Sequence, residues 1–156
     1  MRVLRRAFPG IAKRVSIAAP IHIDQRGNLS IGSESFLNTD CVILNGAQVS
    51  IGANVLVGPG VVFAADGHHI DPLERAADPS AKSKPITIED NVWIGARAVI
   101  CPGVTIGANS VIGAGSIVTR DVPPGVLAAG NPCVVKRSVS ANQENWTGAD
   151  GLKRAA

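Results

Sequence analysis

Proton transfer near neutral pH is the chemistry for which this sequence has the clearest candidates, because it contains three histidines, His22, His68 and His69. An imidazole has an ordinary pKa of about 6.5 and can therefore accept a proton at pH 7. His68 and His69 are adjacent in the stretch FAADGHHIDP, residues 63–72. A general base there would contribute about 10²- to 10⁴-fold to a reaction rate. The residues alone do not decide between His68 and His69, whereas His22, beside a predicted strand, is expected to be a wall residue.

Metal and disulfide chemistry have weaker support in the sequence. A zinc site for hydrating carbon dioxide would need all three imidazoles to converge, but adjacent residues of a strand, such as His68 and His69, point to opposite sides. Cys41, Cys101 and Cys133 lack the paired spacing of metal ligands, and three cysteines do not form a disulfide framework. We therefore expect no metal, and small core cysteines in a protein of the reducing cytoplasm.

The elements that must position the histidines follow an internal repeat. Four stretches align, each with an aliphatic residue, a small polar residue, isoleucine, a turn and a second aliphatic residue. They are LSIGSESFLN from Leu29, VSIGANVLVG from Val49, ITIEDNVWIG from Ile86 and VTIGANSVIG from Val104. Their central isoleucines, at positions 31, 51, 88 and 106, are 20, 37 and 18 residues apart. From Ile88 to Val118 an aliphatic residue recurs at every sixth position.

A period of six predicts a short strand and a tight corner in each unit. Three units bring the chain back beside itself at strand spacing, about 4.8 Å further along, so that aliphatic side chains stack inside a prism. The composition agrees, since 15 Ile and 18 Val outnumber 8 Leu, while aromatic residues make up only 3%. An antiparallel sandwich would show two-residue alternation instead. The predicted fold class is all-β, a parallel β-solenoid.

The two irregular separations predict where the repeat is interrupted. A separation of 20 predicts a two-residue bulge near Asn45-Gly46, and 37, which is 18 plus 19, predicts one loop inserted over residues 66–85. This loop begins at the histidines, and long loops without a repeat are usually functional or disordered. We divide the chain into a solvent-exposed N-terminal strap (1–15), a β-helix domain (16–125) and a C-terminal arm and tail (126–156).

Charge and hydropathy exclude two classes of partner. The net charge of +3 is small, and no set of aromatic residues accompanies it for stacking bases, so no nucleic-acid partner is expected. No apolar run approaches the roughly 18 residues of a membrane helix. The polar tail from Ser138 is expected to be loosely ordered, with Trp146 docked on a neighbouring coil.

From about Ile31 to Arg137 the sequence resembles the hexapeptide-repeat acetyltransferases, and within them the galactoside and maltose O-acetyltransferase branch. The resemblance rests on four motifs in order, GHHIDPLER, PITIEDNVWIG, PGVTIGANSVIGAGSIVTRDVPPG and AGNPCVVKR. It implies a left-handed parallel β-helix, a homotrimer and acetyl-CoA as the acetyl donor. It also implies that His68 is the base, because the family's base follows threonine or glycine and precedes x-Ile/Leu-Asp-Pro. His69 would then be a solvated loop residue.

The same resemblance implies two substrate-binding residues, Asn38 for the acceptor and Trp93 near the pantetheine arm of the donor. For Asn38 a stacked asparagine ladder at a corner is the structural alternative. On the donor side it implies backbone contacts to the pantetheine amides at Ala96 and Ala114, contacts to the adenine and 3′-phosphate from Thr119 and Arg120, and a phosphate contact from Arg137.

Three features depart from the family pattern. Asn45-Gly46 replaces an acidic pair that sugar-acetylating members usually carry. Val134 stands where galactoside-type members often have arginine, although Lys136 could substitute for it. The resemblance also leads us to expect that the helical N-terminal segment, which helps to close the acceptor pocket in the family, is absent or reduced to residues 1–15.

The leading functional hypothesis is transfer of an acetyl group from acetyl-CoA to a hydroxyl of a sugar or glycoconjugate, with direct attack in a ternary complex and His68 as general base. One alternative is acetylation of the amine of an amino sugar or xenobiotic. The other is a trimeric solenoid scaffold without catalytic activity.

Overall fold

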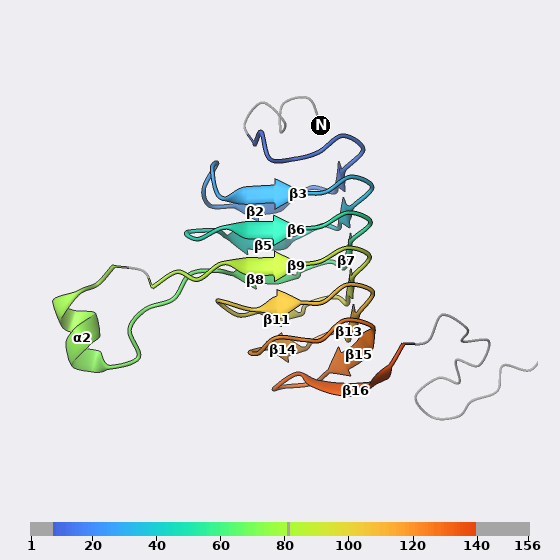
Figure 1. The fold of residues 1–156 in the computed structure, drawn as a ribbon. Coiled ribbons are helices and arrows are strands. Elements are labelled where there is room, and N and C mark those ends of the chain that lie inside the picture. Colours follow the sequence, from blue (N-terminus) through green and yellow to red (C-terminus); the bar gives the residue numbers. More distant parts are fainter. Residues whose placement is uncertain (1–7, 81, 140–156) are drawn as a thin grey trace, which may run out of the picture.

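The computed structural model describes residues 8–80 and 82–139, which wind into a left-handed parallel β-helix, as predicted (Figure 1). The strands form three sheets, one on each face of a prism. The seven-stranded sheet contains β1 (Ser16–Ile17), β4 (Phe36–Leu37), β7 (Leu56–Val57), β10 (Trp93–Ile94), β13 (Val111–Ile112), β15 (Val126–Ala129) and β16 (Val134–Ser138). The five-stranded sheet contains β2 (Ile21–Ile23), β5 (Cys41–Leu44), β8 (Val62–Ala64), β11 (Val99–Ile100) and β14 (Ile117–Val118). The four-stranded sheet contains β3 (Leu29–Ile31), β6 (Val49–Ile51), β9 (Ile86–Ile88) and β12 (Thr105–Ile106).

The strand register confirms the predicted coil lengths. Trp93 of β10 pairs with Val111 of β13, one regular coil of 18 residues further on. Ile31 pairs with Ile51, a coil of 20 residues, and Ile51 pairs with Ile88 across the insertion. The additional pair of residues also occurs one coil earlier, where Ser16 pairs with Phe36, and the four aligned stretches do not reach this coil. All named pairs are parallel except β15 with β16.

The core consists of the aliphatic columns that the repeat predicts. Ile88, Ile94, Ile100 and Ile106 are each at most 1% exposed, and Phe63 is a fully buried ring in the same interior. Burying one such side chain contributes roughly 1.5–3 kcal/mol, and every coil adds three to the stack. Stability therefore grows coil by coil, and the outer positions of the strands remain free for other roles.

The prism has three edges, named here by the order in which each coil passes them. The first edge joins the seven-stranded to the five-stranded sheet and includes Asn38, Gly58, Gly95 and Gly113. The second edge joins the five-stranded to the four-stranded sheet, and the inserted segment leaves the prism there. The third edge turns through residues with positive φ, which asparagine tolerates: Asn54, Asn91 and Asn109 have φ of 56°, 57° and 62°.

The inserted segment runs from the end of β8 at Ala64 to the start of β9 at Ile86, and it projects from the second edge (Figure 1). It contains the short helix α2 (Pro72–Ala77), which the sequence analysis did not predict. Asp71 is its N-cap, since its side chain accepts hydrogen bonds from the N–H groups of Leu73 and Glu74, and proline stands at the first helical position. No residue of α2 is buried, so the helix lies outside the core.

The ends of the β-helix are covered in different ways. Residues 8–15 do not form the solvated strap that was predicted, because Phe8, Ile11 and Val15 are at most 8% exposed and close the first coil. At the other end β16 folds back antiparallel on β15. Trp146, expected to dock on a coil, lies outside the described residues. Within the part of the chain that the structure describes, no helix has the length and apolar content to cross a bilayer.

Candidate functional site

His68 lies at the point where the inserted segment leaves the second edge of the prism. Its side chain is exposed, and within residues 8–80 and 82–139 no side chain or backbone group forms a hydrogen bond or ion pair with its imidazole. Both ring nitrogens are therefore available to a ligand. This is the state that a general base needs before an acceptor hydroxyl arrives.

The inserted segment returns beside itself, and this neck fixes the residues immediately before His68. Ala65 is fully buried at the root, and its carbonyl accepts a hydrogen bond from Lys84 N at 2.8 Å. Gly67 O accepts one from Lys82 N at 2.6 Å, and Asp66 Oδ1 accepts one from Ser83 Oγ at 2.7 Å. Three hydrogen bonds thus hold the chain just before it reaches His68.

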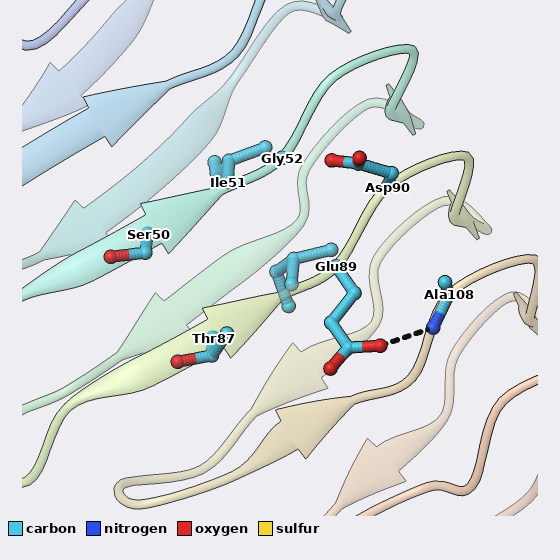
Figure 2. Close-up of a pocket in the computed structure, with 8 residues that line it drawn as sticks. Ser50, Ile51, Gly52, Thr87, Glu89, Asp90 and Ala108 are labelled. Atoms are coloured by element: carbon cyan, nitrogen blue, oxygen red, sulfur yellow. Dashed lines mark hydrogen bonds between the residues drawn. The ribbon is translucent and has the colours of Figure 1, made fainter.

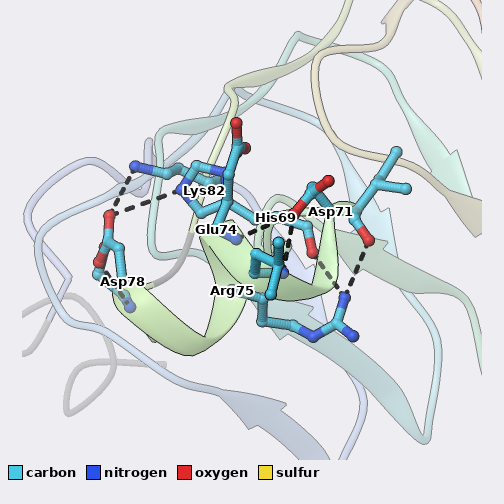
Figure 3. Close-up of polar contacts among 9 residues, drawn as sticks. His69, Asp71, Glu74, Arg75, Asp78 and Lys82 are labelled. Atoms are coloured by element: carbon cyan, nitrogen blue, oxygen red, sulfur yellow. Dashed lines mark hydrogen bonds and ion pairs between the residues drawn. The ribbon is translucent and has the colours of Figure 1, made fainter.

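His69 is not the solvated loop residue that was predicted. Its side chain is only 22% exposed, Nδ1 lies 2.9 Å from Glu74 Oε2, and Nε2 lies 3.6 Å from Asp78 Oδ2 (Figure 3). The two neighbouring histidines therefore have different environments. His69 is engaged by carboxylates of α2 and its C-cap, and only His68 is free to meet a substrate. His22 lies on β2 with its side chain exposed on the wall, as expected.

The residues that depart from the family's acidic pair have a structural role at the second edge. Asn45 is completely buried, and its carboxamide donates to Gln25 O at 2.7 Å and accepts from Gln25 N at 2.8 Å. A Cβ on Gly46 would collide with Asp66 Oδ1 and lie 2.8 Å from Ser83 Oγ. Asn45 therefore joins two coils, and Gly46 makes room for the neck. An acidic pair would disturb both contacts.

Asn38 follows β4 at the first edge and does not belong to an asparagine ladder. The residues above and below it in the stack are Ala18 and Gly58, as shown by the bonds from Ala18 N to Leu37 O and from Asn38 N to Val57 O. Asn38 Oδ1 accepts from Thr39 N at 2.8 Å, while Nδ2 has no bond to any residue in the described ranges. The side chain thus has an unused donor. A ladder bond does occur at the third edge, where Asn91 Nδ2 donates to Asn109 Oδ1 at 2.8 Å.

Trp93 lies in an apolar column on the outer face of the seven-stranded sheet. The register aligns Phe36, Leu56, Trp93, Val111 and Leu127 along this face. Leu56 is 51% exposed and Trp93 is 55% exposed. The corresponding outer column of the four-stranded sheet consists of hydroxyl side chains, from Ser30 to Thr105. The seven-stranded face therefore has the apolar surface that a pantetheine arm or another chain would cover.

The predicted donor-binding residues are divided between two edges. Ala96 and Ala114 follow β10 and β13 at the first edge, one residue beyond the column that contains Asn38, and Gly115 N donates to Ala96 O at 2.8 Å. Thr119 and Arg120 follow β14 at the second edge, the edge that also carries the inserted segment. Arg137 lies on β16, paired with Leu127, and Val134 on the same strand is 50% exposed. In a single chain the predicted residues thus lie on two sides of the five-stranded sheet. At or beside the first edge are Asn38, Trp93, Ala96 and Ala114. At the second edge are His68, Thr119 and Arg120.

A shallow hollow of about 390 Å³ lies on the four-stranded sheet, near the third edge and away from His68 (Figure 2). Its carboxylates are already engaged with neighbouring coils. Glu89 Oε2 accepts from Ala108 N at 2.8 Å, and Asp90 Oδ1 accepts from Ala53 N at 2.8 Å. These carboxylates join the turns of neighbouring coils, and we therefore assign no catalytic role to the hollow.

Two residues near His68 were not identified from the sequence, Asp66 at the neck and Arg75 in α2. The guanidinium of Arg75 donates to His69 O at 2.8 Å and to Ile70 O at 3.1 Å (Figure 3). A signal for the helix was present, because Asp71-Pro72 is typical of an N-cap and first helical residue. The return of Arg75 to the preceding carbonyls depends on a side-chain conformation that no spacing encodes.

Comparisons with known proteins agree with this architecture. Residues 85–120 match the family described as the hexapeptide repeat of succinyl-transferase. Galactoside O-acetyltransferase of Escherichia coli K12 is 40% identical over 144 residues, which cover 92% of this chain and 70% of that protein. A galactoside acetyltransferase solved in complex with coenzyme A is 37% identical with a TM-score of 0.88, covering 99% of this chain and 76% of that one. A maltose O-acetyltransferase from Clostridium difficile 630 is 40% identical with a TM-score of 0.85, covering 89% and 74%.

These likenesses extend over nearly the whole chain and include the inserted segment as well as the coils. Identity of about 40% over such a length is far more than a shared six-residue rhythm would produce. The Cys41 thiol, fully buried, and the half-buried Cys101 and Cys133 lie against the same core as the repeat residues, as expected. The chain belongs to the hexapeptide-repeat acetyltransferases, in the branch of the galactoside and maltose O-acetyltransferases.

Proposed function

We propose that this protein transfers an acetyl group from acetyl-CoA to a hydroxyl of a sugar or glycoconjugate, with His68 as the general base. The observation that carries the proposal is the exposed His68 imidazole, which has no partner in the described residues and follows a neck held by three hydrogen bonds. Holding the base before substrate binds reduces the ordering that the reaction requires.

The reaction requires one proton acceptor and no covalent enzyme intermediate. As the acceptor oxygen attacks the thioester carbonyl carbon, its proton passes to His68. The carbon–sulfur bond then breaks, and the proton returns from His68 to the sulfur of CoA. The products are the acetyl ester and CoA with its thiol restored, so atoms and charges balance without a metal.

The acceptor is assigned to the first edge. The free Nδ2 of Asn38 would donate to a hydroxyl oxygen of the acceptor, because that amide is otherwise unused. Galactosides and maltose are the first acceptors to test, since relatives with these substrates in their names are about 40% identical to this chain. The buried Asn45 and the small Gly46 do not supply a carboxylate to this acceptor.

The donor is assigned to the same edge as Asn38, on the coils that come after it in the sequence. Trp93 would cover the pantetheine arm, and small side chains at Ala96 and Ala114 would let its amides reach the backbone. The cationic residues would contact the nucleotide end. They are Arg120 on the second edge, beside the hydroxyl of Thr119, and Lys136 and Arg137 on β16.

The separation of these residues favours a homotrimer as the active form. His68 projects from the second edge, whereas Asn38, Trp93, Ala96 and Ala114 lie along the first. If the second edge of one chain faces the first edge of the next, the contact surfaces differ. Such head-to-tail contacts close into a ring of three when each chain is rotated by a third of a turn from the next. Each site would then combine residues of two chains, and the exposed Leu56 and Trp93 would be covered.

Reduced cysteines accord with a cytoplasmic location.

Acetyl-CoA turnover against a panel of acceptors tests the function. CoA release should require a hydroxyl acceptor such as a galactoside or maltose, and His68→Ala should lower kcat about 10²- to 10⁴-fold. Release with glucosamine that yields an amide would instead support N-acetylation. A trimeric scaffold would show no turnover and no increase in melting temperature at millimolar CoA, although a specific ligand must stabilise the folded state. His68→Ala with activity within threefold of the unchanged protein would contradict the assignment of the base.

A further inference from the structure

We propose that Arg75 is a positioning residue, which restrains His68 by holding the carbonyls of the two residues that follow it, and that His69 assists by tying this segment to α2. The inference rests on the proposed function of His68 as the base. It goes further by naming the groups that hold this base in place. The neck restrains the chain before His68, and polar side chains of α2 restrain the chain after it.

Helix α2 cannot hold the loop by its own stability. It has six residues, and isolated helices shorter than about 12–15 residues are marginal in water. It buries no residue, and Ile70 and Leu73 are 96% and 80% exposed, so apolar packing does not attach it to the prism. Its polar contacts must therefore define the conformation of residues 68–78.

These polar contacts meet at the residues adjacent to His68. Arg75 Nη1 donates to His69 O at 2.8 Å and to Ile70 O at 3.1 Å, so one guanidinium holds two consecutive carbonyls (Figure 3). The backbone of Arg75 also donates to Asp71 O at 3.0 Å. A charged donor makes shorter and stronger hydrogen bonds than a neutral one. The backbone that follows His68 is thereby restrained from the C-terminal side.

His69 adds a second connection between the same segment and the helix. Its ring lies between Glu74, 2.9 Å from Nδ1, and Asp78, 3.6 Å from Nε2 (Figure 3). Lys82 Nζ lies 2.9 Å from Asp78 Oδ2, which joins this group to the returning segment of the neck. The carboxylates on both sides of the ring thus belong to a connected set of polar groups.

His68 therefore stands between two fixed points. On its N-terminal side the neck holds Asp66 and Gly67, and on its C-terminal side Arg75 holds the carbonyls of His69 and Ile70. The backbone on both sides of His68 is thus restrained before a substrate binds. Displacement of a reacting group by about 1 Å can cost roughly 10²-fold in rate. Loss of the guanidinium should therefore reduce the rate of proton transfer without changing the donor-binding edge.

Steady-state kinetics of Arg75→Ala and Arg75→Lys test this role. With acetyl-CoA and the best acceptor of the panel, Arg75→Ala should lower kcat about 10- to 100-fold and leave the KM for acetyl-CoA within about twofold. Arg75→Lys should recover part of kcat, because an ammonium is a point donor that cannot copy the planar guanidinium fork. His69→Asn should lower kcat in the same direction by a smaller factor. The melting temperature should be unchanged, since α2 contributes nothing to the core. Arg14→Gln is the matched control, because it removes an exposed ion pair with Glu34 far from the loop.

A double-mutant comparison separates positioning from a general structural effect. If Arg75 acts through His68, then Arg75→Ala should not lower further the residual rate of His68→Ala. An equal loss in both backgrounds, or a kcat of Arg75→Ala within threefold of the unchanged protein, would overturn the proposal. These outcomes leave the proposed function intact if His68→Ala alone is inactive. A fully active His68→Ala would instead remove the proposed function and this inference with it.

Discussion

Gly46→Ala probes the contact between the coil and the neck of the inserted segment, 20 residues apart in sequence. The new Cβ would collide with Asp66 Oδ1 and lie 2.8 Å from both Asp66 Cγ and Ser83 Oγ. The φ of Gly46 is not positive, so the backbone itself accepts alanine and the cost is steric. Asp66 must move, and its hydrogen bond with Ser83, 2.7 Å long, is lost.

The magnitude follows from these two effects. The lost hydrogen bond contributes about 1 kcal/mol, and displacement of packed atoms adds a similar amount. We expect a free energy of unfolding lower by about 2 kcal/mol, which corresponds to a melting temperature lower by roughly 4–8 °C for a chain of this length. Because His68 lies two residues after Asp66, kcat should also fall several-fold.

Chemical denaturation of Gly46→Ala, Asp66→Ala and the double variant is the assay. In the Asp66→Ala background the collision with the carboxylate is absent, and Ser83 Oγ, which has lost its acceptor, can rotate away from the new Cβ. Gly46→Ala should therefore cost less than about 0.5 kcal/mol there, and it can stabilise by restricting the unfolded chain. A Gly46→Ala variant as stable as the unchanged protein would refute the argument. So would an equal loss of stability in both backgrounds.

Further changes test other parts of the structure. Asn45→Asp should lower the free energy of unfolding by about 2–4 kcal/mol at pH 7, because Gln25 O loses its donor and a charge is buried; urea denaturation beside Asn54→Asp, at an exposed corner, measures it. Asn38→Ala should raise the KM for the acceptor about 10-fold with an unchanged KM for acetyl-CoA, and an effect on both would contradict its assignment to the acceptor. Burial raises the pKa of the Cys41 thiol, so less thiolate is present at pH 8, and a thiol reagent should label Cys41 only on unfolding; labelling in the native state would contradict its burial.

The coils could be predicted from the sequence because their information is local and repeated. The position of each isoleucine in the six-residue repeat, from Ile88 to Ile112, predicts its position in the coil. Six residues are enough to specify one strand and one corner. The insertion was located for the same reason, since any change in the repeat shows as a change in the separation of these isoleucines.

The environment of the histidines could not be predicted because it depends on contacts that have no period. His69 was expected to be solvated, yet Glu74 and Asp78 lie beside its ring only because Asp71 starts a helix at that point. Residues 8–15 were expected to be exposed for a related reason. Their basic composition suggested an exposed segment. Phe8, Ile11 and Val15 are nevertheless buried against the first coil, although they precede the part of the sequence in which the repeat can be recognised.

Asn45-Gly46 illustrates how a departure from a family pattern can be misunderstood when only the sequence is known. The missing carboxylates appear as a loss on the acceptor side. In the folded chain Asn45 pairs with the backbone of Gln25, and Gly46 leaves space for Asp66. The substitution of this pair is therefore coupled to the neck that carries His68.

Rescue of His68→Ala by free imidazole tests most directly whether His68 is the general base. This variant should lose at least about 10²-fold in kcat, and added imidazole should restore CoA release in proportion to its concentration, because the vacated position is exposed to solvent. A His68→Ala variant that releases CoA at the unchanged rate without imidazole would show that His68 is not the base.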